Sequence, residues 1–127
     1  LYCAPTVDDR EVWRATMRHV AVEGRCFVLA ACQYARRADY PADYECLQGD
    51  DPETVLIGGG SLIVDPFGEV LAGPLVGETG VLVAQIDPDR RTEGLFDLDV
   101  TGHYARPDVF ELRVDTREQQ FRANLED

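Results

Sequence analysis

The segment 8–32 constrains the fold most, because helical periodicity in its first part gives way to an uncharged run. Within residues 8–25 arginines alternate with apolar residues that recur at helical spacing, namely Trp13, Met17, Val20, Ala21 and Gly24. This pattern is typical of an amphipathic helix that lies on a sheet. Residues 26–32 carry no charge and do not alternate, which is typical of a strand covered on both faces.

Both ends of the predicted helix carry sequence signals. Asp8 with Glu11 predicts a capping box at its start, and Gly24 predicts a left-handed residue at its end. The apolar residues 1–5 before the helix predict a further strand, and a strand–helix–strand unit normally places its two strands parallel. We therefore expect an α/β fold. Because the first residues already resemble a core strand, we also expect an N-terminal part of the domain to be missing from this chain.

Composition excludes several classes of partner. The formal net charge is −12, and all 12 basic residues are arginines, so the chain contains no lysine. Nucleic acids and anionic membranes require a basic surface, and neither is expected as a partner. No apolar run reaches the length of about 18 residues that a membrane-spanning helix needs.

The four cysteines predict neither disulfides nor a metal site. Cys3, Cys26 and Cys32 lie in predicted strands, where a free cysteine behaves as a small apolar residue. No CxxC motif or Cys/His cluster indicates a metal. We expect reduced thiols and a cytoplasmic protein.

The middle of the chain contains a long polar segment and a hairpin. Residues 34–54 are either a solvated loop or a protein-contact insertion that uses Tyr34, Tyr40 and Tyr44. Residues 58–61 (GGGS) predict close backbone packing or a bulge, because a phosphate-binding loop would need a lysine and a following helix. The segment Asp65–Gly68 matches a type I turn between two strands.

The last part of the chain is more polar. Residues 81–86 predict a strand, and Asp87 followed by Pro88 predicts the start of a short helix from Asp89 towards Leu98. We expect the domain to cover residues 1–115 and to end in a polar tail at 116–127.

No catalytic set is visible among the polar residues. The strand cysteines lack a neighbouring base, and acidic neighbours would raise the pKa of Cys46. His19 is interpreted as a buried structural histidine or a partner-facing one, and His103 as more exposed. Glu23, at the helix end, is expected to have a structural partner such as an arginine or a backbone donor.

Several motifs together resemble the C-terminal half of the nitrilase branch of the carbon–nitrogen hydrolase family. They occur in the family's order and are YCAPT at 2–6, MRHVAVEGRCFVL at 17–29, GGGS at 58–61, DPFG at 65–68, LAGP at 71–74 and GHYARPD at 102–108. The combination of His-x-Ala-x-Glu-Gly with Gly-His-Tyr-x-Arg-Pro-Asp favours nitrilases over amidases and carbamoylases.

The resemblance implies an α-β-β-α sandwich and a cysteine thiolate that attacks a nitrile carbon. A thioimidate then yields carboxylic acid and ammonia, without a metal or cofactor. The family uses glutamate, lysine and cysteine for catalysis, and its cysteine would lie just upstream of residue 2. No residue of this chain is therefore assigned a catalytic role, and we expect the isolated chain to be inactive.

Other roles are assigned from strand ends and from the resemblance. Ligands gather at the carboxyl ends of strands, so Pro5, Thr6 and Val7 are expected to line the pocket for a small nitrile, with Gln33 and Tyr34 as further candidates. The resemblance also implies a dimer-based, spiral-forming homo-oligomer. Its predicted interface residues are Trp13, Met17, His19, Tyr40, Tyr44 and His103, while Glu23 and Gly68 are predicted to be structural.

Two alternatives remain open at this point. The chain could be a non-catalytic nitrilase-like module that binds or oligomerises, or it could derive from an amidase or carbamoylase. In each case a partial sandwich would leave apolar strand faces uncovered, so we expect the isolated chain to self-associate.

Overall fold

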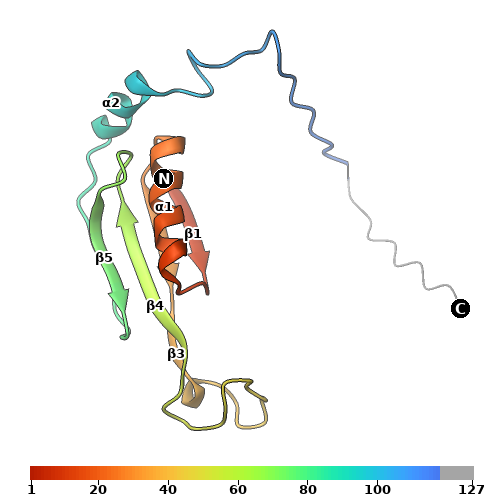
Figure 1. Ribbon diagram of the computed structural model, residues 1–127. Helices are drawn as coiled ribbons and strands as arrows, with labels where there is room; N and C mark the ends of the chain where they lie inside the picture. Colours follow the sequence, from red (N-terminus) through yellow and green to blue (C-terminus); the bar gives the residue numbers. More distant parts are fainter. Residues whose placement is uncertain (118–127) are drawn as a thin grey trace, which may run out of the picture.

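The computed structural model describes residues 1–117, so the predicted polar tail at 116–127 lies almost entirely outside the described residues. Its strands form one mixed sheet, and a helix packs on one face of that sheet (Figure 1). In chain order they are β1 (Tyr2–Thr6), α1 (Glu11–Gly24), β2 (Val28–Cys32), β3 (Tyr34–Arg36), the short 3₁₀ helix η1 (Arg37–Asp39), β4 (Val55–Val64), β5 (Val70–Val76) and α2 (Asp89–Asp97).

The sheet is built around β4. On one side β4 pairs antiparallel with β2 and then with β3, and on its other side it pairs antiparallel with β5. The first strand, β1, lies parallel to β2, with Tyr2 opposite Val28 and Thr6 opposite Cys32. The predicted parallel crossover through α1 is therefore confirmed, and the carboxyl ends of β1 and β2 lie at the same edge of the sheet.

Helix α1 covers one face of this sheet and forms the core with it. The buried side chains of the helix and of β1, β2 and β4 make one cluster, which contains Ala4, Met17, Ala21, Val28, Ala30, Leu62 and Val64. Trp13, Val20 and Cys26 are partly buried against that cluster. The predicted apolar stripe of the helix is confirmed, since it supplies the residues that face the sheet.

The predicted helix caps are wrong by a few residues. The residue at the N-cap is Arg10, and no side chain caps the first turn. Asp8 instead accepts a hydrogen bond from the backbone N–H of Arg10 and pairs with its guanidinium, which lowers the pKa of Asp8 to about 2. At the other end the left-handed residue is Arg25, with φ of 43°, and not Gly24.

The second face of the sheet is covered only in part, which corrects the prediction of a strand buried on both sides. In β2 the side chains of Val28 and Ala30 are buried under α1, whereas Leu29 is half-buried and Ala31 is exposed. Residues 80–82 cross this face and border a cavity of about 270 Å³ with β2 and β4. The predicted strand at 81–86 is wrong too, because this segment makes no ladder with the sheet.

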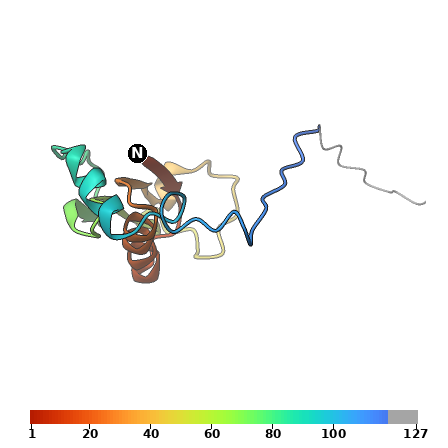
Figure 2. The same cartoon turned by 90° about the horizontal axis from the view of Figure 1, so that it is seen from above.

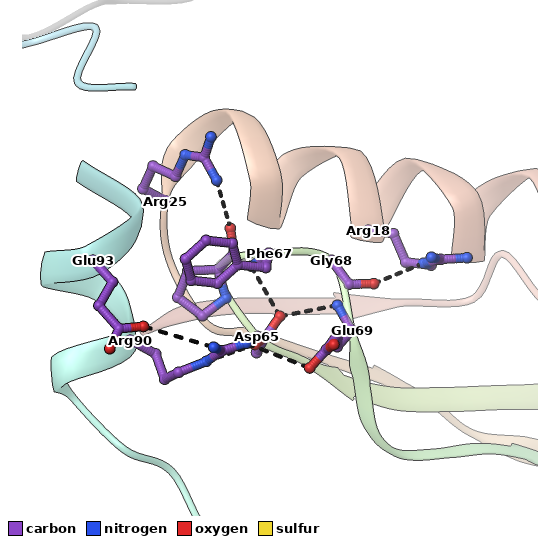
Figure 3. A network of polar contacts seen from close by, with 9 residues as sticks. Arg18, Arg25, Asp65, Phe67, Gly68, Glu69, Arg90 and Glu93 are labelled. Atoms are coloured by element: carbon purple, nitrogen blue, oxygen red, sulfur yellow. Dashed lines mark hydrogen bonds and ion pairs between the residues drawn. The ribbon is translucent and has the colours of Figure 1, made fainter. Parts of the chain in front are cut away.

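The predicted hairpin is confirmed, and a buried carboxylate holds its turn (Figure 3). The Gly68 N–H donates to the Asp65 carbonyl over 3.0 Å, as in a type I turn. Asp65 Oδ1 accepts the N–H groups of Phe67 and Glu69, each at 2.9 Å. Its Oδ2 accepts Arg90 Nη2 of α2 at 2.7 Å, so one side chain fixes both the turn and the second helix.

Gly68 also links this turn to α1. Its carbonyl accepts Arg18 Nε at 2.9 Å, and its φ is +83°. A Cβ at this position would lie 2.9 Å from Val22 Cγ2. The structure thus gives a physical reason for the structural role predicted for Gly68.

A buried arginine organises the long segment between β3 and β4. Arg37 is 6 % exposed, and its guanidinium donates to the carbonyls of Tyr40, Pro41, Ala42 and Tyr44. The rings of Tyr40 and Tyr44 stack with their centroids 5.8 Å apart. The segment predicted as one loop therefore consists of β3, η1 and a compact loop. No local sequence signal indicated that Arg37 would lie at its centre.

Beyond α2 the described chain leaves the sheet as an extended segment (Figure 2). Among residues 1–117 no helix is long and apolar enough to cross a membrane.

Candidate functional site

A large cavity lies at the edge of the sheet where β1 and β2 end. It has a volume of about 890 Å³, within the range of small-molecule sites. The residues that line it are Pro5, Thr6, Val7, Ala31, Cys32, Gln33, Tyr34, Ser61, Leu75, Glu78, Thr79 and Gly80. Pro5, Thr6 and Val7, predicted to line a substrate pocket, thus lie together along this cavity, and so do Gln33 and Tyr34.

The floor of the cavity is formed where the pairing between β2 and β4 is interrupted. Gly59 and Gly60 have φ of +82° and +118°, and the register between β4 and β5 shifts at this point. Ser61 Oγ replaces the missing ladder bonds, since it accepts the Cys32 N–H and donates to the Cys32 carbonyl, both at 2.9 Å. The bulge predicted for 58–61 is confirmed, and it bends β4 beside the cavity.

The turn between β1 and α1 forms another wall. Thr6 Oγ1 accepts the Asp8 N–H at 2.9 Å, which fixes the chain as it leaves β1. Asp9 Oδ2 accepts the Gly58 N–H of β4 at 2.7 Å, and the Asp9 carbonyl accepts Arg14 Nη1 at 3.1 Å. This turn is therefore attached to the central strand and positions Pro5, Thr6 and Val7 with it.

Cys32 is the thiol at the cavity, and its surroundings make it a poor nucleophile. Burial raises its pKa, the negative charges of Asp9 and Asp8 raise it further, and Arg14 offsets only part of this. A thiol with a raised pKa stays protonated near neutral pH. Within residues 1–117 no cluster of His, Cys, Asp and Glu could hold a metal ion. This wall can bind and orient a small molecule, but its thiol is not suited to act as a nucleophile.

Both histidines lie away from the cavity. His19 is exposed on α1, and its Nε2 lies 3.3 Å from Glu23 Oε2, so the interpretation as a buried histidine is wrong. Glu23 does have a partner, but it is His19 and not an arginine or a backbone donor. His103 lies in the extended segment against the ring of Tyr104, with ring centroids 4.6 Å apart.

The predicted interface residues differ in exposure. Met17 is only 3 % exposed and packs in the core of its own chain, so its side chain offers almost no surface to a partner. Trp13 is half-buried against the same core, and its Nε1 has no acceptor among residues 1–117. Tyr44 is 56 % exposed, while Tyr40 is half-buried against it. Their roles in an interface stay a prediction.

Sequence reasoning missed the wall contributed by β5 and the loop after it. Leu75, Glu78, Thr79 and Gly80 line the cavity. No motif in the sequence indicated that residues 77–80 would be part of a site. Their position beside β1 depends on the pairing of β4 with β5, and the periodicity of a single strand carries no such information.

Comparisons with known proteins place this arrangement in a family. The carbon–nitrogen hydrolase family model matches residues 8–94. A nitrilase of Bradyrhizobium diazoefficiens is 60 % identical over 117 residues, which are 92 % of this chain and 36 % of the relative. An arylacetonitrilase of Trametes versicolor and an aliphatic nitrilase of Sinorhizobium fredii are each 56 % identical, over 90 % and 91 % of this chain and 36 % and 37 % of the relative.

The chain thus spans about a third of the length of these curated relatives. That share does not confirm the C-terminal half expected from the motifs. The mixed α/β sheet is consistent with a nitrilase-type fold, of which residues 1–117 contain one sheet and its helix layer. The matched region includes α1, all of β2 to β5 and residues 78–80, which border the cavity. This chain belongs to the carbon–nitrogen hydrolase family.

Proposed function

We propose that this chain is part of a nitrilase, in which it forms one wall of the pocket that holds the nitrile. The observation that carries this proposal is the cavity at the carboxyl ends of β1 and β2, lined by Pro5, Thr6 and Val7. The similarity to three nitrilases supports the reaction class. Because one of these relatives is named for arylacetonitriles and another for aliphatic nitriles, the type of nitrile is left open.

In the proposed reaction a cysteine thiolate adds to the nitrile carbon and the nitrile nitrogen takes up a proton. The resulting thioimidate consumes two waters and releases ammonia and a carboxylic acid. We place the attacking cysteine outside this chain, because Cys32, the one cysteine that lines the cavity, has a raised pKa. The lysine of the family cannot come from this chain, which has none.

We infer that the catalytic glutamate, lysine and cysteine belong to a part of the protein outside these 127 residues. The motif order in the resemblance puts the cysteine upstream of β1, and this remains a prediction. In such an enzyme the ends of β1 and β2 would position the substrate, and α1 would support them from behind. Assembly into a homo-oligomer and a cytoplasmic location likewise remain predictions.

The test compares the protein encoded by the complete reading frame with the purified 127-residue chain. Each is incubated with phenylacetonitrile, with hexanenitrile and with the two matching amides, and ammonia release is measured. We expect the complete protein to release ammonia from at least one nitrile and the chain alone to release none. Ammonia from the amides only would indicate an amidase, and ammonia from the chain alone would show that catalysis needs no residue outside it.

A further inference from the structure

The cavity at the ends of β1 and β2 is lined by a single charged side chain, and this side chain is acidic. Of the residues that line the cavity only Glu78 carries a charge, and none is basic. Glu78 follows β5, is exposed, and has no hydrogen bond or ion pair within residues 1–117. An unpaired carboxylate at the mouth of an otherwise uncharged cavity acts on any charge that a ligand brings there.

The charges behind the wall reinforce this negative potential. Asp9 and Asp8 raise the pKa of Cys32, so their field reaches the cavity floor. The nearby arginines are already engaged by carboxylates: Arg10 by Asp8, and Arg14 by Glu11. An anionic group of a substrate would therefore meet no free cation on this wall.

We propose that Glu78 is a specificity-determining residue that makes this pocket select neutral or cationic nitriles over nitriles that carry a carboxylate. The inference rests on the proposed function and deepens it, because it names the chemical class of substrate. A ligand carboxylate in the cavity would be repelled by Glu78 and by Asp9, whereas an ammonium group would be attracted. An uncharged substrate would bind through Pro5, Val7 and Leu75 without either effect.

The experiment uses the protein encoded by the complete reading frame and two nitriles of equal shape. These are 4-cyanobutanoate, which is anionic, and 5-methylhexanenitrile, in which methyl groups replace the carboxylate oxygens. The kcat/KM for each is measured near pH 7.5 for the wild type, Glu78→Gln and Glu45→Gln. Glu45 serves as the control because it is also exposed but lies outside the cavity.

The wild type is expected to prefer the neutral nitrile. Glu78→Gln should reduce that preference by about fivefold, as expected for one partly screened charge, whereas Glu45→Gln should leave it unchanged. The difference between wild type and Glu78→Gln should shrink in about 0.5 M salt, which a purely structural effect would not do.

Three results would overturn the proposal, and they can be told apart. An unchanged preference in Glu78→Gln, with both nitriles hydrolysed, would show that the carboxylate does not select substrates. An equal loss for both nitriles would indicate a structural role. Failure of the wild type to hydrolyse either of these nitriles or phenylacetonitrile would contradict the proposed function, and the inference with it.

Discussion

Replacing Gly73 by alanine is expected to cost on the order of 4 kcal/mol of unfolding free energy, or to prevent folding. Gly73 lies in β5, which pairs antiparallel with β4, and its φ is +90°. A Cβ there would lie 2.5 Å from the Ser61 carbonyl oxygen and 3.2 Å from Leu62 Cα, both backbone atoms of the central strand. Since backbone cannot move aside as a flexible side chain can, β5 would have to separate from β4.

The measurement is urea-induced unfolding of the purified chain, followed by the fluorescence of its single tryptophan, Trp13, which packs against the core. The matched control is Gly77→Ala. Gly77 has a similar φ of +78°, but a Cβ there would have no heavy atom within 4 Å. That variant should lose only about 1–2 kcal/mol from backbone strain. Equal losses in the two variants would show that the close approach to Ser61 is not what requires glycine at 73.

Replacing Asp65 by alanine is expected to destabilise the fold by about 3 kcal/mol, because removing a buried acceptor costs about 1–3 kcal/mol for each donor that is left unpaired. Asp65 is 1 % exposed and accepts hydrogen bonds from two backbone N–H groups and from Arg90 (Figure 3). Arg90 also lies over the ring of Phe67, with Cζ 4.4 Å from the ring centroid. Without the carboxylate the turn donors lose their acceptor and α2 loses its anchor to the hairpin.

The control for this variant is Asp108→Ala. Asp108 also pairs with an arginine, Arg106, at 2.7 Å, but both side chains are more than half exposed. Exposed pairs of this kind contribute about 0.2–1 kcal/mol at most. The same urea titration should therefore barely change for Asp108→Ala. A small effect for Asp65→Ala as well would mean that the hairpin turn holds without its carboxylate.

The lowered pKa of Asp65 also predicts how the stability of the fold changes as the pH falls. Burial raises the pKa of this carboxyl, but the hydrogen bonds from Arg90, Glu69 and Phe67 outweigh burial, and the pKa is lowered. A carboxyl with a lowered pKa in the folded state contributes stability above its unfolded pKa of about 3.9. That contribution is lost as the pH falls through the lower folded value. Below about pH 4 the wild type should therefore lose stability more steeply than Asp65→Ala.

Local sequence signals predicted those elements whose structure depends only on residues close together in the chain. The apolar stripe from Trp13 to Gly24 gave the helix face, and the DPFG segment at 65–68 gave the hairpin. Proline at 88 and the preceding aspartate indicated α2, and Asp87 Oδ1 does accept the Asp89 N–H at 3.0 Å. In each case the pattern reflects a backbone requirement that lies within a few residues.

Features that depend on distant residues could not be predicted in the same way. Residues 81–86 have the composition of a strand but make no ladder, because residues 80–82 lie across the sheet face instead of along an edge. Arg37 is one of several charged residues in the segment 34–54, yet it is buried and binds four carbonyls. Neither outcome has a signal in local periodicity, since both depend on where the chain returns in space.

The sequence predicted part of the candidate site, because two of the strand ends that form it belong to one strand–helix–strand unit. Parallel strands end at one edge of a sheet, so the crossover itself indicated that Pro5, Thr6 and Val7 would lie near Gln33 and Tyr34. The contribution of Glu78 required the pairing of β5 with β4, which the hairpin indicated, and also the length of β5, which it did not. The bridging role of Ser61 depends on the positive φ of Gly59 and Gly60.

The central claim is that this chain supplies a wall of the nitrile pocket, and a bulky residue placed in that wall tests it most directly. Val7 lines the cavity and is 66 % exposed, while Val12 is 60 % exposed on α1 and lies outside the cavity. In the protein encoded by the complete reading frame, kcat/KM for nitrile hydrolysis is compared between Val7→Trp and Val12→Trp. We expect at least a tenfold loss for Val7→Trp, the order of effect that misfit in a substrate pocket produces, and little change for Val12→Trp. Equal kcat/KM values in the two variants would contradict the assignment of this cavity to the substrate.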